Sequence, residues 1–226
     1  MTCPNRNTME LQIFRMSNTT DEKQIGDDYP QVSIQFYPGK DAWDLSYDSN
    51  LNELVEYGIL RKECIFSDFL STAAFSMNRV FILNERTFLL LRNLKMPDVK
   101  NYSIDIFKKG NKKEYILCMF KFDTRQYILF QNSIFYEDFF NKKSDPITVT
   151  DYDEYYTRGK EAATKGGGIF LPLKLAVSKV ILEHYDIFAF PGISSKVYVT
   201  ARFKNLVEGM KITGLQFDET EEIEMV

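Results

Sequence analysis

Residues 186–217 read DIFAFPGISSKVYVTARFKNLVEGMKITGLQF, and this stretch decides the fold class that the sequence predicts. It opens with short apolar runs typical of strands, and Thr200 then precedes an amphipathic segment at 201–210. Threonine is a favoured N-cap because its hydroxyl accepts a hydrogen bond from a free N–H of the first helical turn. A further apolar run follows at 212–217, where Gly214 permits close packing or a positive φ. The pattern predicts a strand, a capped helix and a closing strand, without a catalytic group.

The composition is that of an ordinary folded protein. The chain has 226 residues, of which 44% are hydrophobic, 27% are charged and 15% are aromatic. Aromatic residues favour half-buried pleated surfaces, so their abundance favours sheet. The net charge of −4 disfavours a nucleic-acid binder, which needs a basic surface, and is compatible with a basic protein partner.

The domain organisation that we expect is simple. Residues 1–9 are polar and are expected to be disordered. A single α+β domain is expected at 10–217, with possible sub-lobes at 10–145 and 146–217. Residues 218–226 read as a mobile acidic tail.

Hydrophobic periodicity and turn residues give the element predictions. Strands are predicted at 11–14, 32–37, 80–83, 102–107, 114–122, 126–130, 147–150, 169–175, 179–182, 186–190, 196–200 and 212–217, and 133–140 is a possible addition. Helices are predicted at 51–57, 85–94 and 201–210. A fourth helix is predicted to begin after a cap at Thr150 or Asp151 and to continue through Ala163. Residues 19–28 read as a polar loop and 108–113 as a hairpin turn. The prediction is an α+β fold with mainly antiparallel sheet and about four helices.

Two segments share one pattern. Residues 79–89 and 196–206 each start with a basic residue, continue with apolar strand residues and a capping residue, and enter an amphipathic helix. Each leads towards another strand. The match indicates two similar strand–helix–strand units, although chance similarity of two amphipathic segments is an open alternative.

The usual carriers of chemistry are sparse. His184 has no second partner that would make a catalytic or metal site. The three cysteines, Cys3, Cys64 and Cys118, are odd in number and lack metal-ligand spacing, which indicates a reduced, cytoplasmic chain. The glycines at 166–168 follow a helix instead of preceding one, unlike a phosphate loop. We expect no cofactor, no signal peptide and no membrane span.

The densest functional-looking cluster is Asp151, Asp153, Glu154, Tyr155 and Tyr156. Acids in a first helical turn favour the helix dipole, which is the structural interpretation. The functional interpretation is a partner-binding patch, because acids beside tyrosines suit a basic protein surface. A third interpretation, a divalent-metal site for a hydrolase or transferase, uses Asp151 and Asp153.

The C-terminal stretch resembles a family of bacterial immunity proteins. The resemblance covers residues 169–217 and rests on Asp186-Ile187-Phe188, the cap at Thr200, the helix that follows, and Ile212-Thr213-Gly214-Leu215-Gln216-Phe217. Such proteins accompany polymorphic toxins that are delivered between competing cells. The resemblance implies a cytoplasmic, non-enzymatic α+β protein that binds and neutralises a cognate toxin, and it supplies no catalytic residues.

Two alternatives stay open at this point. One is the metal-dependent enzyme that uses Asp151 and Asp153, and the other is a structural or adaptor domain that self-associates through aromatic surface. The sequence leaves the oligomeric state open.

Overall fold

The computed structural model describes residues 12–76, 80–140, 142–165 and 167–226 and confirms the α+β prediction, with 39% strand and 23% helix. The strands are β1 Ile13–Asn18, β2 Val32–Phe36, β3 Val55–Leu60, β4 Phe69–Leu70, β5 Val80–Leu83, β6 Asp98–Lys108, β7 Asn111–Lys121, β8 Ile134–Phe139, β9 Lys142–Lys143, β10 Ile169–Val177, β11 Ile187–Ala189, β12 Val197–Thr200, β13 Leu215–Glu219 and β14 Ile223–Met225. The helices are α2 Glu22–Ile25, α3 Glu85–Leu91, α4 Tyr152–Thr164, α5 Ile181–His184 and α6 Ala201–Gly209, with 3₁₀ turns η1 Ala42–Asp44, η2 Leu51–Glu53, η3 Arg125–Tyr127 and η4 Phe130–Asn132.

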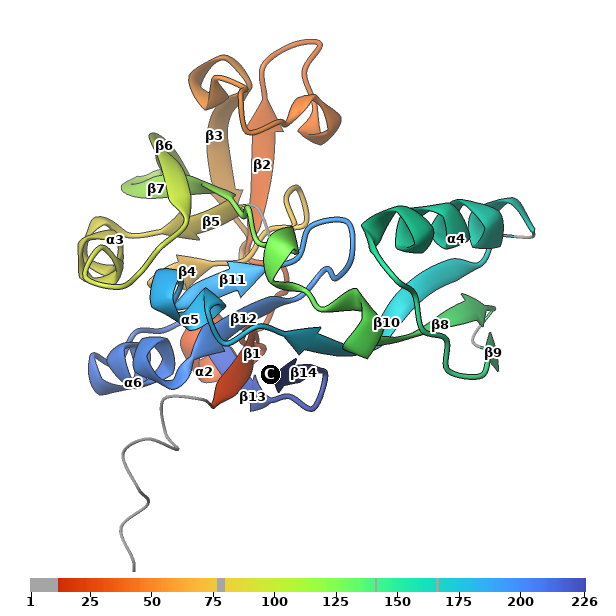
Figure 1. Ribbon diagram of the computed structural model, residues 1–226. Coiled ribbons are helices and arrows are strands. Elements are labelled where there is room, and N and C mark those ends of the chain that lie inside the picture. The colour runs from red at the N-terminus through yellow and green to blue at the C-terminus, as the bar shows by residue number, and fades with distance from the viewer. Residues whose placement is uncertain (1–11, 77–79, 141, 166) are drawn as a thin grey trace, which may run out of the picture.

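The strands form three sheets (Figure 1). The largest has the order β2-β3-β6-β7-β5-β4, the second β11-β12-β1-β13, and the third β14-β10-β8-β9. The third sheet carries α4 and extends to one side of the molecule (Figure 1). Its strands β8 and β10 pair antiparallel, so the predicted extension at 133–140 is a strand of this sheet and does not continue the β6–β7 hairpin.

Four of the six strands of the largest sheet have the same spatial order and relative orientation as the strands of the second sheet. The order β4-β5-β7-β6 matches β11-β12-β1-β13, and neighbours are antiparallel in both. Helix α3 follows β5 as α6 follows β12. The N-terminal strand β1 therefore occupies in the second unit the place that β7 occupies in the first. The two similar sequence segments lie in equivalent positions of two similar folding units.

The caps of the two helices define the correspondence. Asn84 accepts a hydrogen bond from the Thr87 N–H at 2.9 Å, and Thr200 accepts one from the Phe203 N–H at 3.3 Å. Both predicted caps are confirmed. Asn84 and Thr200 are therefore equivalent positions in the two units, as the shared sequence pattern predicts.

The two units share a core. Phe81 and Leu91 enter it from the first unit, and Phe203 and Val207 enter it from the second, each less than a tenth exposed. A fully buried side chain of this size contributes roughly 1.5–3 kcal/mol. The inward faces of α3 and α6 therefore bind the units to each other as well as to their own sheets.

The predicted helix at 51–57 is wrong. Only Leu51–Glu53 is helical, as the 3₁₀ turn η2, and the chain then continues as β3 between β2 and β6. Val55 and Tyr57 are good strand formers, and pairing on both sides outweighs the helical spacing of the leucines. Gly58, which directly follows the predicted helix, lies inside the strand.

Other short predictions also fail. Residues 126–130 run from η3 into η4, residues 179–182 enter α5, and the loop at 19–28 contains α2. Residues 147–150 form only an isolated bridge, between Ile147 and Phe135. Apolar runs of four or five residues have no periodicity that separates a strand from a buried helical turn.

The expectation of a mobile acidic tail is wrong. Residues 218 and 219 complete β13, and β14 pairs in parallel with β10. Three of the tail's acids form ion pairs: Asp218 with Arg15 at 2.8 Å, Glu224 with Lys174 at 2.8 Å, and Glu222 with Lys196. Residues 1–9, expected to be disordered, lie outside the described residues.

Candidate interaction site

The predicted cluster lies at the start of α4, and its acids help to build the helix. Asp151 is the N-cap and accepts a hydrogen bond from the Glu154 N–H at 2.9 Å. Glu154 accepts one from the Thr150 N–H at 2.8 Å and pairs with Arg158 at 2.9 Å. The pKa of Glu154 lies below its usual value, mainly because its carboxylate accepts the Thr150 N–H and secondly because it accepts a hydrogen bond from Arg158. These two acids therefore stabilise the first turn, as the structural interpretation predicts.

Tyr155 does not belong to an exposed patch, which corrects its place in the predicted site. Its side chain is buried, and its hydroxyl lies 3.2 Å from the Phe170 carbonyl oxygen and 3.3 Å from that of Gly192. Burial raises its pKa to about 12. Helical spacing explains this result, because adjacent positions on α4 point in different directions and only one of two neighbouring tyrosines faces outward. Tyr155 fixes α4 to β10 and to the β11–β12 connection.

The outward side of α4 carries a stack of rings and cations. Tyr152 and Tyr156 are one helical turn apart, with ring centroids 6.1 Å apart and an interplanar angle of 21°. The Arg125 guanidinium lies 3.6 Å from the centre of the Tyr152 ring, and the Lys160 ammonium lies 4.3 Å from that of Tyr156. Tyr156 is 50% exposed, and the neighbouring Asp153 is exposed. We call the set Arg125, Tyr152, Tyr156 and Lys160 the stacked ladder.

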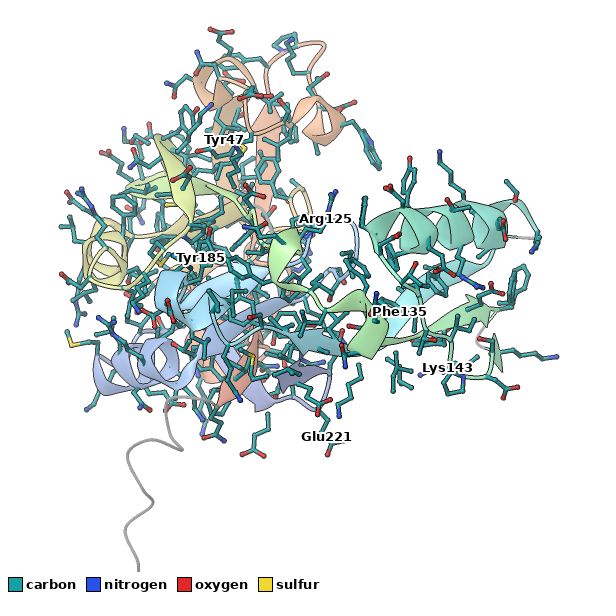
Figure 2. All side chains as sticks on the ribbon, viewed as in Figure 1. Tyr47, Arg125, Phe135, Lys143, Tyr185 and Glu221 are labelled. Atoms are coloured by element: carbon teal, nitrogen blue, oxygen red, sulfur yellow. The ribbon has the colours of Figure 1, made fainter. Side chains whose placement is uncertain are left out.

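An open groove of about 580 Å³ begins at the arginine end of the ladder. Arg125 and Tyr152 line it together with side chains that include Phe122, Thr124, Phe130, Phe190, Pro191 and Ile193. In Figure 2, Arg125 lies on the segment that faces the α4 side of the molecule. The groove is lined mostly by apolar side chains, with the Arg125 cation and the exposed Asp123 among them, which is the surface character of a protein-binding site.

The sequence did not identify Arg125 or Lys160 as part of the site. Tyr152, Tyr156 and Lys160 follow one another at intervals of four, a spacing that places side chains on one helical face and is readable from the sequence. Arg125 has no such signal, because it comes from η3 and reaches Tyr152 only through the tertiary fold.

The residues considered for catalysis are placed as follows. His184 lies beside the rings of Tyr127 and Tyr185, with centroid distances of 6.0 and 6.2 Å. Cys64 and Cys118 are buried thiols. Within the described ranges, no group of three or more His, Cys, Asp or Glu side chains is arranged to hold a metal ion. In the same part of the chain, no helix is long and apolar enough to cross a bilayer.

Comparison of the sequence with protein-family models and with curated proteins gives no match.

Proposed function

We propose that the protein is a non-catalytic immunity protein that acts in the cytoplasm by binding and neutralising a cognate bacterial toxin. The observation that carries the proposal is the stacked ladder, in which Tyr152, Tyr156 and Lys160 lie on α4 while Arg125 reaches the Tyr152 ring from η3 beside a groove. Rigid aromatic and arginine side chains bind partners at a low entropic cost. The resemblance of residues 169–217 to immunity proteins supplies the class of partner.

The chemistry of the surface indicates how a toxin is held. An apolar side chain of the toxin enters the groove, and the Arg125 guanidinium binds a carboxylate of the toxin through its N–H groups. Asp151 and Asp153 face lysine or arginine side chains at the margin. The bound chain then blocks the toxin's active site or nucleic-acid groove by steric occlusion.

The proposal is tested by capture of the partner. The full chain is used to isolate bound protein from a lysate of the source organism, the complex is sized, and the captured protein is expressed with and without this chain. A stoichiometric partner that stops growth unless the chain is co-expressed is the expected result. A chain that captures nothing, or captures a protein harmless to the host, contradicts the proposal.

A further inference from the structure

The most exposed large apolar side chain in the described residues lies outside the stacked ladder and its groove. Trp43, the only tryptophan of the sequence, is 94% exposed. It belongs to residues 37–54, the connection between β2 and β3, which we call the tip loop and which stands at the top of Figure 1. Tryptophan is the residue most enriched among the energetic centres of protein interfaces. A tryptophan that contributes nothing to the core is therefore a candidate anchor for a partner.

The tip loop is held in one shape. Trp43 lies in η1, whose cap Asp41 accepts a hydrogen bond from the Trp43 N–H at 2.7 Å. Asp44 returns a hydrogen bond by accepting the Asp41 N–H at 2.9 Å, which completes a capping box. The indole is thus presented on a fixed turn, and its ordering cost is met before any partner binds.

The base of the loop is tied to the largest sheet. Lys100, from β6, donates a hydrogen bond to the Tyr47 carbonyl oxygen at 2.7 Å and lies 4.7 Å from the centre of the Tyr47 ring. The hydroxyl of Tyr102 lies 3.3 Å from the Ser49 carbonyl oxygen. These contacts fix the loop from below and leave Trp43 outward.

The charge of the loop defines the partner. The loop has one exposed amine, that of Lys40, and four exposed carboxylates, those of Asp41, Asp44, Asp48 and Glu53. These 18 residues carry a net charge of −3, while the whole chain carries −4. Such a field attracts a basic surface and repels an anionic membrane.

We propose that the tip loop docks onto a basic protein surface that has an apolar pocket for the Trp43 indole. The inference goes beyond the proposed function, because the loop and the stacked ladder are separate surfaces and each can fail without the other. The acids around the indole accelerate association with the basic partner and align it, and the indole contributes most of the affinity.

The test uses a random peptide library displayed on phage, selected against the full chain. Expected are enriched peptides that carry lysine or arginine together with an apolar residue, that shift the Trp43 fluorescence to the blue, and that bind less tightly as salt is added. Trp43→Ala weakens them at least about tenfold, the loss typical of an interface centre. Asp48→Asn weakens them less and reduces the dependence on salt, while the matched variant Asp27→Asn, an exposed aspartate between α2 and β2, binds them like the unmodified chain.

Three results overturn the inference. One is that no peptide is enriched, and another is that enriched peptides are neutral or acidic or bind the Trp43→Ala chain equally well. The third comes from lipid vesicles: binding to anionic or zwitterionic vesicles that depends on Trp43, without binding of basic peptides, assigns the indole to a membrane instead. Because Trp43 is exposed, its replacement leaves the melting temperature unchanged, which circular dichroism verifies.

Discussion

Asp68 and Asp186 make equivalent hydrogen bonds in opposite directions across the contact between the two units. Asp68 accepts the N–H of Thr213, just beyond α6, at 2.8 Å, and Asp186 accepts the N–H of Lys95, just beyond α3, at 2.9 Å. With its other oxygen each carboxylate accepts a hydrogen bond from the cap of its own unit, Asn84 at 2.6 Å or Thr200 at 2.9 Å. Each aspartate therefore fixes one helix start and joins it to the end of the other unit's helix.

We predict that Asp186→Ala lowers the free energy of unfolding by about 3 kcal/mol, because it leaves the buried Thr200 hydroxyl and the partly buried Lys95 N–H without this acceptor. Asp68 is less buried, so Asp68→Ala is expected to cost about 1–2 kcal/mol. Urea denaturation measures both values. Asp105→Asn, which breaks only a surface ion pair with Lys112, is the control and costs under about 1 kcal/mol. Equal losses for all three variants would show that the paired aspartates have no special role.

Gly214→Ala is predicted to be among the most destabilising single changes, at about 4 kcal/mol or more. Gly214 has a φ of +97°, and an added Cβ lies 2.1 Å from the Phe69 carbonyl oxygen, so both expectations for this glycine are confirmed. Gly39→Ala is the matched control, since Gly39 also has a positive φ but open space around its Cα. It costs about 1 kcal/mol through backbone strain alone. Thermal unfolding of the two variants separates the clash from the strain.

Alkaline pH is predicted to destabilise the fold through buried tyrosines. The pKa of Tyr155 is raised from 10.0 to about 12, so the unfolded chain loses this proton before the folded chain does. The corresponding stability is present below pH 10 and is lost as the pH rises towards 12, at about 1.4 kcal/mol per pH unit for one proton. Tyr155→Phe lowers stability at neutral pH by about 1 kcal/mol and reduces this slope by one proton. Urea denaturation at several pH values measures how the free energy of unfolding depends on pH. The same slope in Tyr155→Phe and in the unmodified chain would show that the Tyr155 hydroxyl is solvated in the folded state.

Removal of residues 222–226 is predicted to destabilise the protein by about 1–3 kcal/mol. The truncation deletes β14 and its parallel pairing with β10, and it leaves Lys196 without Glu222. Thermal denaturation measures the loss. A melting temperature equal to that of the full chain would show that these residues are a free tail, as the sequence alone indicated.

Local patterns are the part of the fold that the sequence could predict. The two helices that follow a strand and a capping residue begin where predicted, after Asn84 and Thr200, because caps act within one turn. The hairpin between β6 and β7 was also found, since Gly110 has the positive φ that its turn requires. Pro172 lies beside a register shift in β10, as expected for a proline within a strand.

Long-range pairing is the part that the sequence could not predict. Nothing in residues 13–18 indicates that this strand completes a sheet with β12 and β13, and nothing in 223–225 indicates a partner in β10. The same limit applies to the candidate site. Acids and tyrosines on α4 were visible as a cluster, but the burial of Tyr155 and the approach of Arg125 depend on neighbours distant in sequence.

The most direct test of the immunity proposal is a calorimetric titration of the captured partner into the full chain and into the double variant Asp153→Asn/Tyr156→Ala. Both side chains are exposed on α4, so the variant keeps the melting temperature, and Lys179→Ala, on a remote exposed residue, is the matched control. Our account predicts that the double variant binds at least about tenfold more weakly and no longer rescues growth, while the control does both normally. Affinity and rescue equal to those of the unmodified chain would contradict it.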